Sequence, residues 1–325
     1  MNKNIKKLIK KGMGKAATFS SYISFGRICS NLRIRKTILM ILSPLGIVLL
    51  LFNKKYKNIK LKYNLSAVLI IKNEGDYIKE WIEYYKNLGF EKIYIYDNDS
   101  TDNVYKKLIK YIDVGLVSYT KMSGHARQLD AYNDALKKAK RESKYLAIVD
   151  ADEFLFPVKD DDICTVLDRY MQSANNVGGL CVNWLIFGSS GYMNQTSELV
   201  TQRFKHRSKY DFNKNQHVKT ICDPRKVAGV LNPHIVEYII GCYAINSFYQ
   251  KVDRPFTKYN SNAPLRINHY FTKSKNEFVR KRARGEADSL NVRNMKDFDI
   301  HDRNEVFDDS MKRYRNVLEK TTGQK

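Results

Sequence analysis

The pattern of apolar and polar positions changes near residue 64, where strand-like and helix-like segments begin to alternate. Residues 67–71 form a continuous apolar run, which is typical of a strand buried on both faces. Apolar side chains then recur at helical spacing over residues 81–88, with Asn73 as a candidate cap ahead of this helix and Gly89 as its stop. These segments predict one βα unit.

Three more strand-like segments follow, separated by helix-like ones. Strands are predicted at residues 92–96, 116–119 and 145–149, and helices at 104–111 and 128–138. This alternation is typical of an α/β fold with a mostly parallel, doubly wound sheet, and its first half covers about residues 64–157. Further on, strands are predicted at 180–186, 218–221 and 236–240, and charged helices near 274–288 and 304–319.

The first 63 residues differ in composition from the rest. They contain fifteen Lys and Arg and no acid, in a chain of net charge +23. Because the positive charge is concentrated in one terminal segment, we expect that segment to bind an anionic partner, either anionic lipid or another polyanion. Since this charge lies mainly outside the folded domain and no nucleic-acid-binding module is recognisable, we expect an anionic membrane surface and no nucleic acid.

An apolar run at residues 38–52 lies within this basic segment and is interrupted by Ser43, Pro44 and Gly46. As a helix it would reach only about 22 Å, whereas a bilayer core is roughly 30 Å thick. We expect an interfacial or re-entrant anchor, with a single membrane pass as an alternative. Basic residues on both sides suit two ends at the cytoplasmic face of a bacterial inner membrane. A further alternative is a helix docked on the folded domain.

The five cysteines are scattered, without a CxxC pair or a metal-ligand spacing. This usage fits a reduced, cytosolic environment.

Polar side chains follow the predicted parallel strands, at the sheet edge where ligands bind in open α/β folds. Lys72, Asn73 and Glu74 follow the first strand, Asp97 and Asp99 the second, and Asp150, Asp152 and Glu153 the fourth. Asp150 and Asp152 would repel each other unless a cation lay between them. Hard oxygen ligands suit Mn²⁺ or Mg²⁺ completed by the phosphates of a nucleoside diphosphate. The alternative is that the pair only caps a helix or lines a solvated turn.

The remaining candidate site residues are spread along the chain. Asp97 could accept hydrogen bonds from a base or ribose, although turn chemistry alone also explains it. His125, Arg127 and Gln128 begin a helix, where N–H groups and an Arg favour a phosphate or sugar hydroxyl, unless this is only a helix start with an exposed Arg. Trp184, Phe187, Gly188 and Ser189 would suit an acceptor sugar, although Trp184 could equally pack in the core. Either His234 or His269 could complete a metal site, or both could be structural.

A cationic stretch begins at Lys273 and continues with Arg280, Lys281, Arg282 and Arg284. It could neutralise a diphosphate, or it could simply be a solvated basic face.

Several of these segments together resemble glycosyltransferase family 92 and its bacterial family-2-like relatives. The similar segments are residues 71–74 with Glu80 and Trp81, 94–102, 124–133, 148–154, Trp184 with 187–191, and 269–285. The resemblance covers roughly residues 65–310. It implies a GT-A fold with an acceptor half at about 158–325, a UDP-type donor, a divalent metal on Asp150 and Asp152, Asp97 on the nucleoside, and inversion at the anomeric carbon. Residues 219–234 look like the segment that carries a later metal-binding histidine, which favours His234 over His269.

The sequence departs from the family-2 pattern because no Glu-Asp pair follows the acceptor loop, which leaves Glu153 and Asp223 as the candidates for the general base. The predicted function is metal-dependent transfer of a sugar from a nucleotide sugar to a glycan or glycolipid, in surface polysaccharide biosynthesis. A non-catalytic sugar-binding module and a nucleotidyltransferase are the alternatives.

Overall fold

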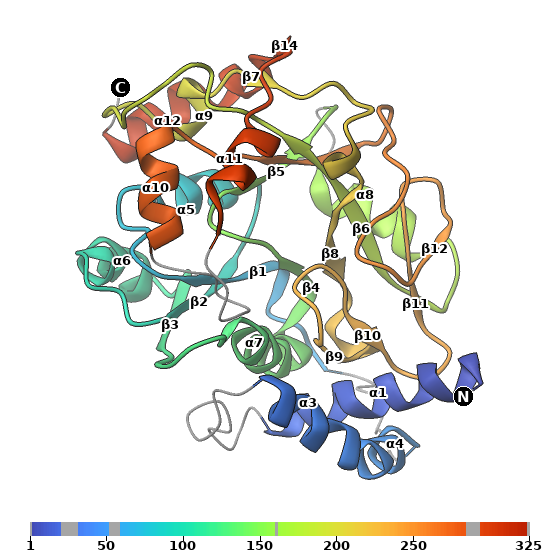
Figure 1. Ribbon diagram of the computed structural model, residues 1–325. Helices are drawn as coiled ribbons and strands as arrows, with labels where there is room; N and C mark the ends of the chain where they lie inside the picture. The colour runs from blue at the N-terminus through green and yellow to red at the C-terminus, as the bar shows by residue number, and fades with distance from the viewer. Residues whose placement is uncertain (1, 21–31, 52–58, 160–161, 284–292, 324–325) are drawn as a thin grey trace.

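The computed structural model describes residues 2–20, 32–51, 59–159, 162–283 and 293–323 (Figure 1). Phe52, at the end of the apolar run, and residues 284–288, at the end of a predicted helix and including Arg284, lie outside the described residues.

A mixed sheet forms the centre of the molecule, with its strands in the order β12-β11-β6-β8-β4-β1-β2-β3 and with β13 joining β5 to β6 (Figure 1). The strands are β1 Tyr63–Ile71, β2 Lys92–Asp97, β3 Val117–Lys121, β4 Ser143–Ile148, β5 Glu153–Pro157, β6 Val177–Ile186, β8 Val218–Cys222, β11 Tyr243–Ile245, β12 Lys251–Val252 and β13 Leu265–His269. The helices after the N-terminal segment are α5 Ile78–Asn87, α6 Val104–Asp113, α7 Gln128–Glu142, α8 Ile163–Met171, α9 Val200–Arg203, α10 Lys275–Ala283, α11 Met295–His301 and α12 Arg315–Thr322. Two short ribbons, β7 His206–Arg207 with β14 Val306–Phe307 and β9 Val227–Gly229 with β10 Glu237–Tyr238, flank the sheet.

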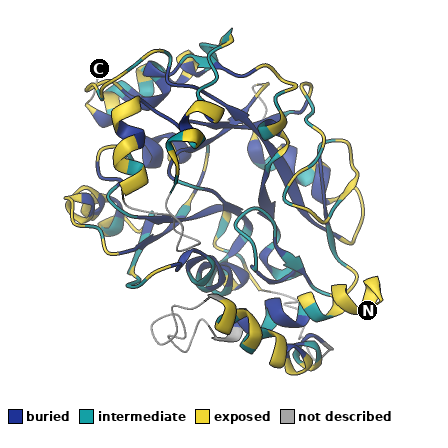
Figure 2. Cartoon of the chain, in the orientation of Figure 1, coloured by how far each residue is buried: buried dark blue, intermediate teal, exposed yellow. Residues whose placement is uncertain are grey.

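The first half confirms the predicted alternation, because β1 pairs in parallel with both β2 and β4, and β2 pairs in parallel with β3. Successive residues of β1 point to opposite faces of the sheet. Leu69 and its alternate neighbours pack with α5 and α6 in one hydrophobic cluster, whereas Val68 and Ile70 pack with α7 in another. A strand buried on both faces explains the continuous apolar run at 67–71 (Figure 2).

The second half is less regular than predicted. β8 runs antiparallel to both of its neighbours, β4 and β6, so the sheet is mixed rather than parallel throughout. The predicted strand at 236–240 is reduced to β10, and the predicted helix at 304–319 is wrong over its first half, which contains β14 and the 3₁₀ turn Ser310–Tyr314. Asn73 does not cap α5 either, since this helix begins at Ile78 without a side-chain cap.

The N-terminal segment contains helices α1 Lys3–Ser20, α3 Leu32–Ile41 and α4 Ser43–Leu51, which form a layer at one end of the molecule (Figure 1). α1 packs against β9, where the Thr18 hydroxyl donates to Ala228 O at 2.6 Å. Glycines permit this close packing: a Cβ on Gly229 would lie 1.9 Å from Gly14 O, and one on Gly46 would lie 2.1 Å from Gly12 O. α1 therefore packs on the folded domain, although it lies before the domain boundary predicted at residue 63.

The apolar run at 38–52 forms the end of α3 and α4, which pack on α1. Among the described helices, none is both long and apolar enough to cross a membrane.

Candidate active site

A cavity of about 230 Å³ opens at the carboxyl ends of β1 and β4. The strand order reverses between these two strands, because β2 and β3 lie on one side of β1 and β4 on the other. Crevices at such a switch point are the usual ligand sites of open α/β sheets. Nine predicted site residues line the cavity, namely Lys72, Glu74, His125, Gln128, Asp150, Asp152, Trp184, His234 and His269. The fold therefore brings these residues together at the sheet edge where the sequence predicted them.

The turn that carries the two aspartates is held by α5 beneath it. The indole N–H of Trp81 donates to the carbonyl oxygens of Asp150 and Glu153, at 3.1 Å each. The hydroxyl of Tyr85 also donates to the carbonyl of Glu153 at 3.1 Å. The aromatic face of α5 thus fixes the backbone from which both aspartates project.

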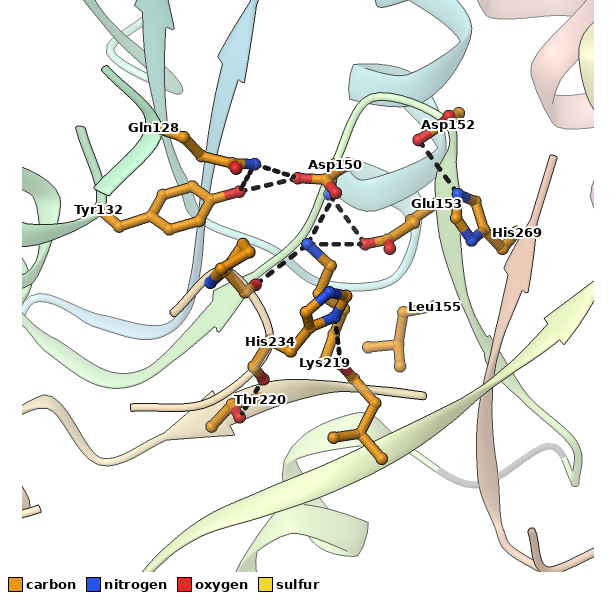
Figure 3. A network of polar contacts seen from close by, with 12 residues as sticks. Gln128, Tyr132, Asp150, Asp152, Glu153, Leu155, Lys219, Thr220, His234 and His269 are labelled. Atoms are coloured by element: carbon orange, nitrogen blue, oxygen red, sulfur yellow. Dashed lines mark hydrogen bonds and ion pairs between the residues drawn. The ribbon is translucent and has the colours of Figure 1, made fainter. Parts of the chain in front are cut away.

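Asp150 lies at the centre of a polar network (Figure 3). Its Oδ1 accepts hydrogen bonds from Gln128 Nε2 at 3.0 Å and from the hydroxyl of Tyr132 at 2.7 Å, while its Oδ2 accepts from Lys219 Nζ at 2.7 Å. Burial alone would raise the pKa of Asp150, but Lys219 and these donors outweigh it and lower the pKa. Asp150 is therefore an anion already held by this chain.

Lys219 is the main residue that the sequence prediction missed. It lies in β8 with its side chain only 1% exposed, and its Nζ is 3.7 Å from Glu153 Oε2. Burial lowers the pKa of Lys219, but the carboxylate of Asp150 outweighs this and the net pKa is raised. The signal was a single Lys inside a buried, mostly apolar strand, since a buried cation needs a counter-ion nearby.

Asp152 points toward β13, where His269 Nε2 lies 3.6 Å from Asp152 Oδ1 (Figure 3). Lys281 of α10 donates from Nζ to Asp152 Oδ2 at 2.5 Å. Burial alone would raise the pKa of Asp152, but Lys281 and His269 hold it well below the ordinary range. Burial also lowers the pKa of His269, so its imidazole is neutral and can donate a lone pair to a metal.

His234 was the metal ligand preferred from the sequence, but the histidine that the structure places beside Asp152 is His269. His234 Nδ1 lies 3.1 Å from Val218 O, and its ring packs edge-on against Trp184 with centroids 5.1 Å apart. Burial, together with Lys219, lowers the pKa of His234 to about 3. The pairing of β13 with β5 instead sets His269 opposite Glu153, next to Asp152.

The fit to a divalent cation rests on Asp152 and His269. Their separation of 3.6 Å is too long for a hydrogen bond, and His269 Nδ1 also lacks a hydrogen-bond partner among the described residues. An ion bound to a carboxylate oxygen and an imidazole nitrogen suits both side chains. In the described part of the chain no three His, Cys, Asp or Glu side chains gather into a complete metal site, so the remaining ligands would have to be phosphate oxygens or water.

Other predicted donor-binding residues hold the loops around the cavity instead of lining it. Asp97 is buried, and its carboxylate accepts from the Tyr119 hydroxyl at 2.6 Å and from Ser100 N at 2.9 Å. Asp99 accepts from Gly124 N at 3.0 Å, and Asn73 accepts from Thr101 N at 2.7 Å. These contacts correspond to the turn role that was the alternative for Asp97. Asn98, between them, does line the cavity and was missed.

Arg127 and Lys273 are also engaged with neighbouring acids. Arg127 is buried and pairs through Nε with Asp130 at 2.8 Å. Lys273 Nζ lies 3.6 Å from Glu74 Oε2 and over the ring of Tyr77. Neither side chain lines the cavity. The cavity-lining cations, besides Lys72, are Lys281 and Arg293.

The predicted acceptor segment divides into two parts. Trp184 lines the cavity, with its ring 4.3 Å from that of His269. Phe187 is fully buried against Tyr270, so it is a core residue. The backbone N–H of Gly188 donates to His206 O, and that of Ser189 donates to Asp302 Oδ1 at 2.6 Å. The acceptor role predicted for Phe187, Gly188 and Ser189 is contradicted by this burial.

Both predicted general bases are away from the cavity. Glu153 is completely buried, with Oε2 accepting from Asp150 N at 2.9 Å, and burial raises its pKa well above the ordinary range. Asp223 follows β8, which is antiparallel to β4, so it lies at the opposite edge of the sheet from Asp150. There it caps a 3₁₀ turn and pairs with Arg225 at 2.8 Å. Neither position suits a base acting on an acceptor in this cavity.

These features define an α/β protein with a carboxylate- and histidine-lined ligand crevice at the switch point of its sheet. The chain belongs to glycosyltransferase family 92, whose family model matches residues 70–308. A family 92 protein of Ricinus communis is 25% identical over 140 residues, which cover 43% of this chain and 25% of the relative. One of Oryza sativa subsp. japonica is 22% identical over 221 residues, 67% of this chain and 35% of the relative. The chain thus spans only a quarter to about a third of these relatives.

Solved structures with some similarity include S. aureus TarS in complex with UDP-GlcNAc, at 15% identity over 50% of this chain and 45% of that one, with a TM-score of 0.32. Glucosyl-3-phosphoglycerate synthase of Mycobacterium tuberculosis with Mn²⁺, UDP-glucose and phosphoglyceric acid has a TM-score of 0.27, at 15% identity over 38% of this chain and 44% of that one. At these TM-scores neither structure informs the details of the present site.

Proposed function

We propose that this protein is a GT-A glycosyltransferase that moves a sugar from a nucleotide-sugar donor, with UDP as the first nucleotide to test, to a glycan or glycolipid acceptor. One observation carries the proposal: Asp152, His269 and Lys281 meet in a cavity at the switch point of the sheet, in a chain that belongs to a glycosyltransferase family. Family membership favours sugar transfer over nucleotidyl transfer, which would use similar acids.

Asp152 and His269 are the residues we propose to hold Mn²⁺ or Mg²⁺. When bound there, a divalent ion would supply positive charge to the diphosphate of the donor. Asp150 differs from Asp152, because its two oxygens already accept three side-chain hydrogen bonds. We therefore assign Asp150 chiefly to organising the site, and Asp152 to binding the ion.

Lys281 is the residue we propose to stabilise the leaving diphosphate. Burial lowers the pKa of Lys281 to about 8, so the side chain is still mostly charged at neutral pH. A cation fixed in a cavity with little water stabilises developing negative charge more than one in bulk solvent. When donor and metal bind, the ammonium group of Lys281 would leave Asp152 and pair with a phosphate oxygen. The positive charge of Lys281 would therefore have a negative partner both before and after binding.

Trp184 is the residue we propose to face a sugar ring, because its indole lies in the cavity wall beside His269. Its indole N–H has no hydrogen-bond partner among the described residues, so it could donate to a sugar hydroxyl. We keep inversion at the anomeric carbon and a surface polysaccharide or glycolipid acceptor as parts of the proposal. Proton NMR of the product's anomeric centre tests the first.

The test measures nucleotide release and sugar transfer from a panel of nucleotide sugars, with Mn²⁺, with Mg²⁺ and with a chelator. The full chain is required, because removing α1 would uncover its packing surface on β9. Release of a nucleoside diphosphate that needs the metal and is lost in Asp152→Asn would support the proposal. Release of pyrophosphate would favour a nucleotidyltransferase instead. Tight nucleotide-sugar binding with no turnover, for any acceptor offered, would favour a non-catalytic binding module.

A further inference from the structure

Much of α3 and α4 is exposed on the side that faces away from the sheet (Figure 2). Several of these exposed residues are large and apolar, although the helices belong to a charged segment. Ile41 is 71% exposed and Leu45 is 54% exposed, and Ile34, Met40 and Val48 are also about half exposed. The opposite face of α4 is already used, because Ser43, Gly46 and Leu50 are buried there. The outer face is therefore apolar without being needed for the packing of the domain.

Positive charge surrounds this face. Arg33 and Lys36 are exposed on α3, and the exposed first half of α1 adds Lys3, Lys6, Lys7 and Lys10. No acid occurs among residues 1–63. A bilayer has anionic headgroups at its surface and apolar acyl chains beneath them. Apolar side chains flanked by cations, with no acidic residue, are complementary to both layers.

The lengths of α3 and α4 indicate whether they would span a bilayer or lie at its surface. α3 has 10 residues and α4 has 9, with a turn at Leu42 between them, and no described helix is long and apolar enough to span a bilayer. Of the two helices, α3 is amphipathic and α4 is apolar nearly all round. Helices too short to span a bilayer, with apolar side chains beside cations, lie in the plane of the headgroups with the apolar side chains inserted. We propose that the outer face of α3 and α4, with the lysines of α1, docks on an anionic lipid surface.

The docking face adjoins the cavity. Arg35 of α3 donates from NH1 to Ala126 O at 3.2 Å and pairs with Asp130, which also binds Arg127. Ala126 lines the cavity beside His125. If the proposed transferase function holds, docking through α3 would bring the cavity close to a lipid-linked acceptor. The docking itself does not depend on that function.

Co-sedimentation of the full chain with vesicles tests the proposal, using phosphatidylcholine alone and phosphatidylcholine with phosphatidylglycerol. The double variant Ile41→Asp/Leu45→Asp should lower the vesicle-bound to free ratio by about tenfold or more, since two inserted apolar side chains are lost. The matched control is Ile109→Asp/Val114→Asp, which places the same charges on an exposed apolar position of α6 and on the exposed apolar residue that caps its C-terminus, and it should bind like the unaltered chain. Lys6→Gln/Lys7→Gln should weaken binding only to the anionic vesicles. An unchanged thermal midpoint in each variant shows that the fold is intact.

Three outcomes would overturn the proposal. The first is no binding of the unaltered chain to anionic vesicles, and the second is equal binding by the Asp double variant. The third is a dimer in light scattering that Ile41→Asp/Leu45→Asp abolishes, without vesicle binding, since a second copy would then cover this face. Vesicle binding is measured without donor or acceptor, so its failure is distinguishable from failure of the transferase proposal.

Discussion

Replacing one partner of the buried ion pair at the centre of the site should separate the roles of two neighbouring acids. Lys219 is 1% exposed and lies 2.7 Å from Asp150 but 3.7 Å from Glu153. The pKa of Asp150 is lowered and that of Glu153 is raised, so we infer that Asp150 carries the charge that neutralises Lys219 while Glu153 holds a proton. Asp150→Asn should therefore be costly and Glu153→Gln cheap.

The magnitudes follow from burial. Asp150→Asn leaves the Lys219 ammonium buried without its counter-ion, a change that typically costs about 3–5 kcal/mol. We expect the lower end, near 3 kcal/mol, because the side chain of Asp150 is 31% exposed at the cavity. Glu153→Gln keeps the shape and the acceptor for Asp150 N, so about 1 kcal/mol or less is expected. Urea denaturation of both variants at neutral pH measures the difference.

The pH dependence gives an independent check. Burial raises the pKa of Glu153, so the folded protein holds a proton that the unfolded chain loses above about pH 4.3. Stability should therefore fall with rising pH from that point up to the folded pKa, and Glu153→Gln should lack this slope. The lowered pKa of Asp150 works in the opposite sense, since its contribution is present above about pH 3.9 and is lost as pH falls through its folded pKa. Equal losses of stability in the two variants would refute the charge assignment.

Three further outcomes are expected. His269→Asn should weaken Mn²⁺ binding by more than the roughly 10–100-fold that loss of an outer-shell partner costs, and electron paramagnetic resonance of free Mn²⁺ detects this without turnover. Gly229→Ala should destabilise the chain by about 1–3 kcal/mol, measured by thermal denaturation, because its new Cβ would lie 1.9 Å from the Gly14 carbonyl. Arg35→Ala should raise the KM for the donor more than it lowers kcat, because the Arg35 contact holds the Ala126 carbonyl in the cavity wall; an unchanged KM would count against that coupling.

The first half of the fold was predictable because its local signals are strong. A strand buried on both faces is apolar throughout, as residues 67–71 are, and α5 has apolar positions at helical spacing. These units fixed the edge at which Asp150 and Asp152 would lie, since parallel strands end at the same edge. The sequence thus predicted which side chains would lie together at this edge, and the cavity there is lined by nine of them.

The second half was harder to predict because its arrangement depends on pairing between distant segments. The direction of β8 decides that Asp223 lies at the wrong edge and that Lys219 reaches Asp150, but a five-residue strand contains no signal for its direction. The choice between His234 and His269 depended in the same way on the pairing of β13 with β5. Burial of Phe187 depends on packing against Tyr270, far along the chain, which residue type alone does not indicate.

The N-terminal segment shows how one composition serves two surfaces. Its lysines and apolar run predicted a partner for the whole segment, whereas the structure divides its side chains between an inner and an outer face. The inner face includes Gly12, where an added Cβ would lie 2.3 Å from Ser43 O, and Gly14, whose carbonyl oxygen lies against Gly229. Ile41 and Leu45 lie on the outer face, where they are 71% and 54% exposed. Since the glycines lie where the chain packs on itself and Ile41 and Leu45 face outward, both faces have to be kept for the segment to fold and bind together. Substitutions on the outer face should therefore change binding without changing stability, and substitutions at the glycines should do the reverse.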